Sequence, residues 1–126
     1  MFDSFKQESA VPNGPDFTAI DSKAKADRLL EIGELEKLFL LPAEFGGTDD
    51  LRNVVYVPRG FVAIKRGIDL NIIRPLVDSG KITAYQATPE YQGESFVPIA
   101  IKIVASNPDS FTTDINIWGK ALARKS

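Results

Sequence analysis

From Ile82 onward, apolar and polar residues alternate with a period of two, and two short turn signals interrupt the pattern. The turns are expected at residues 91–93 (Tyr-Gln-Gly) and 107–109 (Asn-Pro-Asp). In the middle strand, expected over residues 96–104, one side carries only large apolar residues: Val97, Ile99, Ile101 and Ile103. Because strands joined by short turns pair antiparallel, the sequence predicts a β-meander over about residues 82–118 with one strongly apolar face.

The segment before the meander predicts a long helix that can cover this face. Its apolar residues recur every three or four positions: Phe61, Ile64, Ile68, Ile72 and Leu76. This spacing predicts a helix over about residues 59–79 that buries Ile64, Ile68 and Ile72 and leaves Lys65 on its solvated side. Pro75 predicts a kink or a second short helix near Asn71, because a proline removes one helical hydrogen bond.

The first part of the chain is less regular. We expect a short helix that begins after Asp21 or Ser22, either of which can cap it, and ends at Gly33. Residues 35–45 fit a short helix and a strand equally well, and residues 53–57 are typical of a strand.

Residues 1–17 have no apolar period and are expected to form a flexible arm. We expect Phe2, Phe5 and Phe17 to pack against the domain and so attach the arm to it. Residues 18–126 then form a single α+β domain, in which the meander packs on the interrupted helix beside the shorter N-terminal helix.

The composition excludes several kinds of chemistry. The 126 residues include no histidine and no cysteine. This absence excludes thiol nucleophiles, Cys/His zinc sites and Ser-His-Asp catalysis, and it removes the usual general base near neutral pH. We expect no cofactor and no bound metal.

The net charge of −2 gives no overall attraction to nucleic acid or anionic lipid. No segment has the length and apolarity of a membrane span, and the first residues lack a signal-peptide pattern, so the sequence predicts a cytoplasmic protein.

Two groups of residues resemble the sequence pattern of a known protein family. The first is Phe45-Gly46-Gly47 followed by a strand that begins at Asn53, and the second is Thr88-Pro89-Glu90-Tyr91-Gln92-Gly93 with Ser95 and Pro98. In order and spacing they resemble the DNA/RNA non-specific endonucleases of bacterial polymorphic toxins, which have a ββα-metal (His-Me finger) fold. The positions that carry the resemblance are Phe39, Phe45, Gly46, Gly47, Asn53, Pro89, Tyr91 and Gly93.

The resemblance implies a catalytic histidine and a metal-binding asparagine, and this chain departs from both. Phe39 stands at the position of the histidine that takes a proton from water. Val62, or a residue next to it, stands at the position of the asparagine that holds the metal. The resemblance therefore implies a nuclease-like scaffold without its chemistry. In such a scaffold Phe39 is expected to turn inward and close the cleft.

Other residues offer alternative functions. Asp49, Asp50 and Glu44 could hold Mg²⁺ in a phosphodiesterase, although acidic residues beside two glycines are more typical of a solvated turn or a helix cap. Arg59, Lys65 and Arg66 could contact phosphates, although such residues usually form a solvated basic face. Tyr85 and Tyr91 could stack on bases, although aromatic residues on strands usually pack across the sheet.

Three functions follow from these observations. The first is a non-catalytic binding or assembly module that acts through protein–protein contact, with a second copy of the chain as one candidate partner. The second is a metal-dependent phosphodiesterase or nuclease that uses the acidic residues. The third is a non-catalytic nucleic-acid binder.

Overall fold

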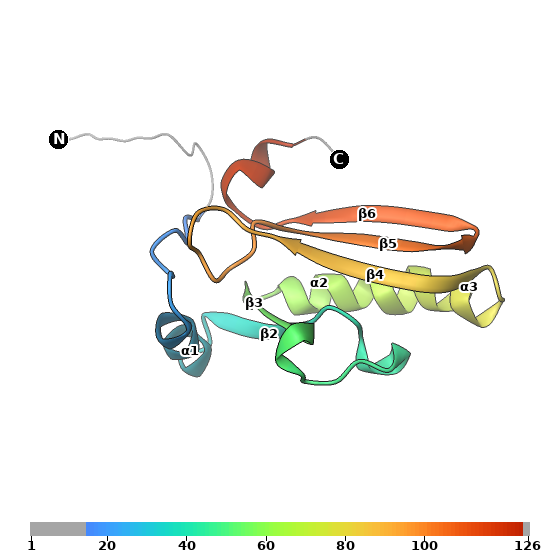
Figure 1. The fold of residues 1–126 in the computed structure, drawn as a ribbon, viewed down its shortest axis with the longest axis horizontal. Helices are drawn as coiled ribbons and strands as arrows, with labels where there is room; N and C mark the ends of the chain where they lie inside the picture. The colour runs from blue at the N-terminus through green and yellow to red at the C-terminus, as the bar shows by residue number, and fades with distance from the viewer. Residues whose placement is uncertain (1–14, 125–126) are drawn as a thin grey trace.

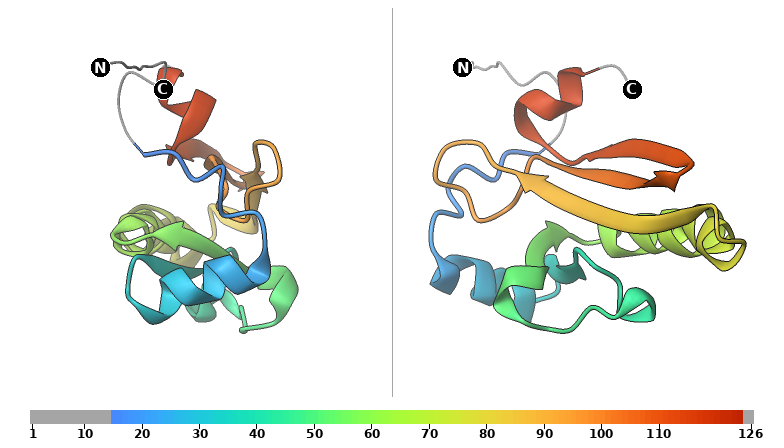
Figure 2. Two further views of the ribbon diagram at one scale, coloured as in Figure 1. Left: turned by 90° about the vertical axis from the view of Figure 1, so that its left-hand side faces the viewer. Right: turned by 45° about the vertical axis from the view of Figure 1, so that its right-hand side comes forward.

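The computed structural model describes residues 15–124, and within this range the chain forms an α+β fold. A three-stranded antiparallel sheet makes up one side of the molecule. The other side of the molecule holds the helices α1 (Lys23–Glu31) and α2 (Phe61–Ile68) and a second, two-stranded sheet (Figures 1 and 2). The predicted fold class is confirmed. The arm expected over residues 1–17 lies outside the described residues except for its last three.

The N-terminal helix α1 starts at the expected place. The Ser22 hydroxyl accepts a hydrogen bond from the Lys25 backbone N–H at 3.2 Å and so caps the first turn. Asp21 instead forms an ion pair with the Lys25 side chain at 2.8 Å. Gly33 follows the helix with a φ of +82°, a conformation that favours glycine.

The ambiguous segment after α1 is a strand. β2 (Leu35–Phe39) pairs antiparallel with β3 (Val54–Pro58), and Phe39 lies opposite Val54. Leu38, Val55 and Val57 share one face of this small sheet, and Leu35 lies on the opposite face. All four are buried in the hydrophobic core, which explains why the sheet forms.

The long helix has the expected extent but not the expected buried face. A π-helical turn, η4 (Asp69–Ile73), joins α2 to α3 (Arg74–Asp78), so the interruption lies where Pro75 predicts it. The prediction of a buried Ile64–Ile72 stripe is wrong: the exposed fractions are 50% for Ile64 and 44% for Ile72. Ile68 is half-buried.

The helix buries a different set of residues, namely Lys65, Asp69 and Ile73. The expected solvated position of Lys65 is therefore wrong as well. After the wide turn, which takes up one residue more than an α-helical turn, Ile73 faces inward in place of Ile72. Lys65 and Ile64 precede the turn. Lys65 can face inward because its ammonium group binds the Asp69 carboxylate, the Leu40 carbonyl and the Tyr85 hydroxyl, and Ile64 then faces outward.

The predicted meander is confirmed as β4 (Ile82–Glu90), β5 (Ala100–Pro108) and β6 (Ser110–Asn116), in the order β4-β5-β6. The middle strand begins at Ala100, four residues later than expected, and residues 96–99 approach it as an irregular segment. The expected apolar face is present, because Val97, Ile99, Ile101 and Ile103 are all fully buried.

The C-terminal part closes the core near the start of the chain. Trp118 is 1% exposed, its indole N–H donates to the Val97 carbonyl at 2.9 Å, and its ring packs edge-to-face on Phe17. The short helix η5 (Gly119–Ala123) follows it. Within residues 15–124, no helix has both the length and the apolarity that a membrane span requires.

Candidate functional site

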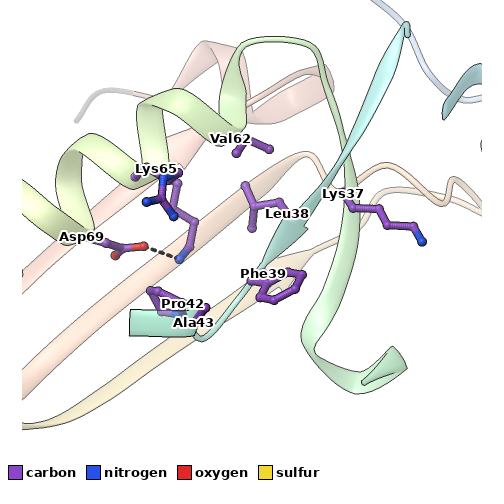
Figure 3. Close-up of a pocket in the computed structure, with 9 residues that line it drawn as sticks. Lys37, Leu38, Phe39, Pro42, Ala43, Val62, Lys65 and Asp69 are labelled. Atoms are coloured by element: carbon purple, nitrogen blue, oxygen red, sulfur yellow. Dashed lines mark hydrogen bonds and ion pairs between the residues drawn. The ribbon is translucent and has the colours of Figure 1, made fainter. Parts of the chain in front are cut away.

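Phe39 and Val62, which stand at or next to the positions where the resemblance implies reactive groups, line one cavity. Its volume is about 190 Å³, and its walls come from the end of β2, the segment that follows it, α2 and the start of the π turn. The lining residues are Lys37, Leu38, Phe39, Pro42, Ala43, Val62, Lys65, Arg66 and Asp69. Figure 3 shows the Phe39 ring and the Val62 side chain at this cavity, with Lys37 extending away from it. Phe39 is half-buried and leaves the cavity open, so the expectation that it closes the cleft is wrong.

A buried ion pair forms the polar part of the cavity wall. The Lys65 ammonium group donates to the Asp69 carboxylate at 2.6 Å, and both side chains are almost completely buried (Figure 3). The two residues are four positions apart, which places them on one face of a helix.

Every polar group of this pair has a partner within the protein. Lys65 Nζ also donates to the Leu40 carbonyl and to the Tyr85 hydroxyl, each at 2.9 Å. The Tyr85 hydroxyl donates in turn to the second Asp69 oxygen at 2.7 Å. The cluster of Lys65, Asp69 and Tyr85 thus ties α2 and the π turn to β4 and to the segment after β2.

The surroundings of the cluster change its acid–base properties. Burial lowers the pKa of Lys65, and the hydrogen bond and charge of Asp69 oppose that effect. Burial first, and then the hydrogen bond to Asp69, raises the pKa of Tyr85. Lys65 has used its three N–H donors, so it has none left to offer a ligand in this arrangement.

The acidic residues that the sequence offers as metal ligands are held by arginines or exposed. The Glu44 carboxylate binds Arg66 at 2.7 Å, and the hydrogen bond from Arg66 lowers the pKa of Glu44. Asp50 binds Arg52 at 3.0 Å and accepts the Arg52 backbone N–H, and these bonds lower the pKa of Asp50 to about 2. Asp49 is exposed. Among residues 15–124 there is no group of three or more carboxylate, His or Cys side chains that could hold a metal ion.

The basic residues proposed for phosphate contact do not form one surface. Lys65 lies in the buried cluster, and Arg66 is paired with Glu44. Arg59 is exposed in the turn before α2.

The family-pattern residues after β2 shape the loop that borders the cavity. Gly47 lies so close to the preceding chain that a Cβ atom there would be 1.7 Å from the Leu41 carbonyl oxygen. The Asn53 side chain binds both the N–H and the carbonyl of Leu41, and it also donates to the Thr48 carbonyl at 2.8 Å. Gly46 has a φ of +100°, and the Phe45 ring packs edge-to-face on Tyr85. This part of the pattern therefore has a structural role in this chain.

The second part of the pattern lies apart from the cavity lining. Pro89 is half-buried in β4, and Gly93 has a φ of +61° in the following turn. Tyr91 is 45% exposed beside Phe96 on a shallow hollow that Gly93, Glu94 and Ser95 also line. Tyr85, by contrast, binds Lys65 and Asp69 in the buried cluster, so the structure does not bring the two tyrosines together.

Asp69 and Tyr85 belong to the buried cluster, a role that the sequence did not predict for either residue. The spacing of Lys65 and Asp69 is a detectable signal, because opposite charges four residues apart form ion pairs on helices. The contact with Tyr85 has no local signal, since it joins residues 20 positions apart in the chain.

Comparison of the chain with models of protein families, with curated proteins and with solved structures found no match.

Proposed function

We propose that this chain is a non-catalytic binding or assembly module, built on a nuclease-like scaffold and acting through protein–protein contact. The observation that carries the proposal is the composition of the cavity. Phe39 and Val62 contribute apolar side chains where the family pattern has a base and a metal ligand. The charged groups of Lys65 and Asp69 bind each other and Tyr85 instead of facing the cavity with free lone pairs or protons.

A phosphodiesterase that uses the acidic residues is less well supported. A metal at Glu44 or Asp50 would have to displace Arg66 or Arg52 from bonds of 2.7 and 3.0 Å. Asp49 alone supplies too few oxygen ligands for a Mg²⁺ site that does not also involve a phosphate.

A nucleic-acid binder is also less well supported. Such a protein needs several lysine or arginine side chains along one surface, because affinity grows with the number of phosphates contacted. Of the three candidate residues, Lys65 is buried and Arg66 is neutralised by Glu44.

The exposure of two isoleucines supports contact with another protein. Ile64 and Ile72 expose about half of their side-chain surface on the outer side of the joined helix. Apolar groups of this kind gain free energy when a partner covers them. A second copy of the chain remains a candidate for that partner.

A cleavage assay tests the proposal. Purified protein is incubated with plasmid DNA, single-stranded DNA and RNA in the presence of Mg²⁺ or Mn²⁺, with EDTA as the matched control. We expect no cleavage above the EDTA control. Metal-dependent cleavage that is lost in Asp49→Ala or Asp50→Ala would overturn the proposal in favour of the phosphodiesterase.

A further inference from the structure

The π turn places two neighbouring isoleucines in opposite environments. Ile73 is fully buried, whereas Ile72 is 44% exposed. The turn is closed by the Arg74 N–H, which donates to the Asp69 carbonyl five residues earlier. A regular α-helix would make this bond four residues back, so the turn holds one extra residue.

Without the extra residue, Ile72 would occupy the place of Ile73. In a continuous α-helix the position seven residues after Lys65 lies on the same face as Lys65 and Asp69, and that position is Ile72. The two registers differ by a rotation of about 100° in the helix after the turn. Since both residues are isoleucine, either register fills the same core position with the same side chain.

The two ends of the joined helix differ in how they are held. Before the turn, the Lys65 and Asp69 side chains are fixed by Tyr85 and the Leu40 carbonyl. After it, α3 buries none of its five residues completely, although Leu76 and Val77 are half-buried. The segment that would rotate is therefore the less firmly packed one.

Pro75 favours the observed register without excluding the other. In a regular helix its ring would press on the Asn71 carbonyl, whereas the wide turn lies directly before it. The α-helical register would recover regular hydrogen bonds in the turn, but it would press the Pro75 ring on the Asn71 carbonyl. These two contributions to the free energy oppose each other.

We propose that the joined helix has two packing registers, in which either Ile73 or Ile72 fills one core position, and that the π turn is the hinge between them. The exchange also changes the surface. Ile72 belongs to the exposed outer side of the helix only in the π register, so a partner that covers Ile72 stabilises that register. The two registers depend on the packing of the helix alone and not on whether the chain is catalytic.

A double-mutant cycle in urea tests the proposal, with Ile73→Ala, Ile72→Ala and the double variant. The matched control is Ile101→Ala, which truncates an equally buried isoleucine in β5. If Ile72 replaces the truncated side chain, Ile73→Ala lowers the unfolding midpoint by less than half as much as Ile101→Ala. The double variant then lowers it by at least about twice the sum of the two single shifts, because no isoleucine remains for the position.

Methyl NMR of Ile73→Ala provides the structural readout: the Ile72 methyl groups gain NOEs to the core side chains that Ile73 contacts in the parent. The opposite results overturn the proposal. These are additive shifts, a loss in Ile73→Ala as large as in Ile101→Ala, failure of Ile73→Ala to fold, or Ile72 methyl groups that stay solvent-exposed. A double variant that fails to fold while Ile73→Ala folds supports it.

Discussion

At the scale of single residues, the buried pair of Lys65 and Asp69 determines how the cavity behaves. Two charges in the interior cost free energy unless each is hydrogen-bonded, and here Tyr85 and the Leu40 carbonyl complete the set of partners. The hydrogen bonds that offset the cost of burying the two charges also engage the Lys65 ammonium group and the Asp69 carboxylate, so these groups are not free to react with a ligand. A lysine near a cavity is therefore no evidence of a nucleophile in this chain.

Truncating Lys65 should cost far more than truncating its exposed neighbour. Lys65→Ala leaves the Asp69 carboxylate buried without its counter-ion, so we expect a loss of about 3 to 5 kcal/mol in the free energy of unfolding. Arg66→Ala breaks a partly exposed ion pair and should cost under about 1 kcal/mol. Urea denaturation of both variants measures the difference. Similar small losses would mean that Lys65 is solvated in solution.

At the scale of elements, the sequence predicts where the helices and strands lie better than which sides they bury. Ser22, Gly33 and the period-two pattern after Ile82 are local signals, and each of them predicts its element correctly. The buried side of the long helix depends on the Lys65–Asp69 ion pair and, after it, on the extra residue of the π turn. Pro75 predicts an irregularity there but does not indicate an extra residue. The pairing of β2 with β3 joins distant residues, so the local pattern left that segment ambiguous.

Gly47, in the loop after β2, and Gly67, in α2, should respond in opposite ways to the same substitution. Gly47→Ala places a Cβ atom 1.7 Å from the Leu41 carbonyl oxygen, so the loop that borders the cavity must move. We expect a loss of at least about 2 kcal/mol. Gly67→Ala meets no atom within 4 Å and lies inside α2, so it should stabilise the protein by up to about 1 kcal/mol.

Thermal and urea unfolding of the two variants provide the measurement. The sign of the difference is the critical result. A Gly47→Ala protein as stable as the parent would show that the turn after Phe45 has another conformation in solution.

At the scale of the whole molecule, the α+β class and the meander follow from hydrophobic periodicity, whereas the site does not. Phe39 and Val62 could be placed near each other only through the resemblance to a nuclease family. The cluster beside them needed the fold, because it brings Leu40, Lys65, Asp69 and Tyr85 together from separate elements. We propose that this cavity neither binds a metal ion nor activates water.

A Mn²⁺ titration followed by NMR tests that claim most directly, because a bound paramagnetic ion broadens the signals of nearby residues whether or not catalysis takes place. The amide signals of Phe39, Ala43 and Val62 report on the cavity, and that of Thr112 on the exposed side of β6 serves as the control. We predict that Mn²⁺ broadens the cavity signals no more than the control signal. Saturable broadening confined to the cavity residues, reversed by Mg²⁺, would contradict the account.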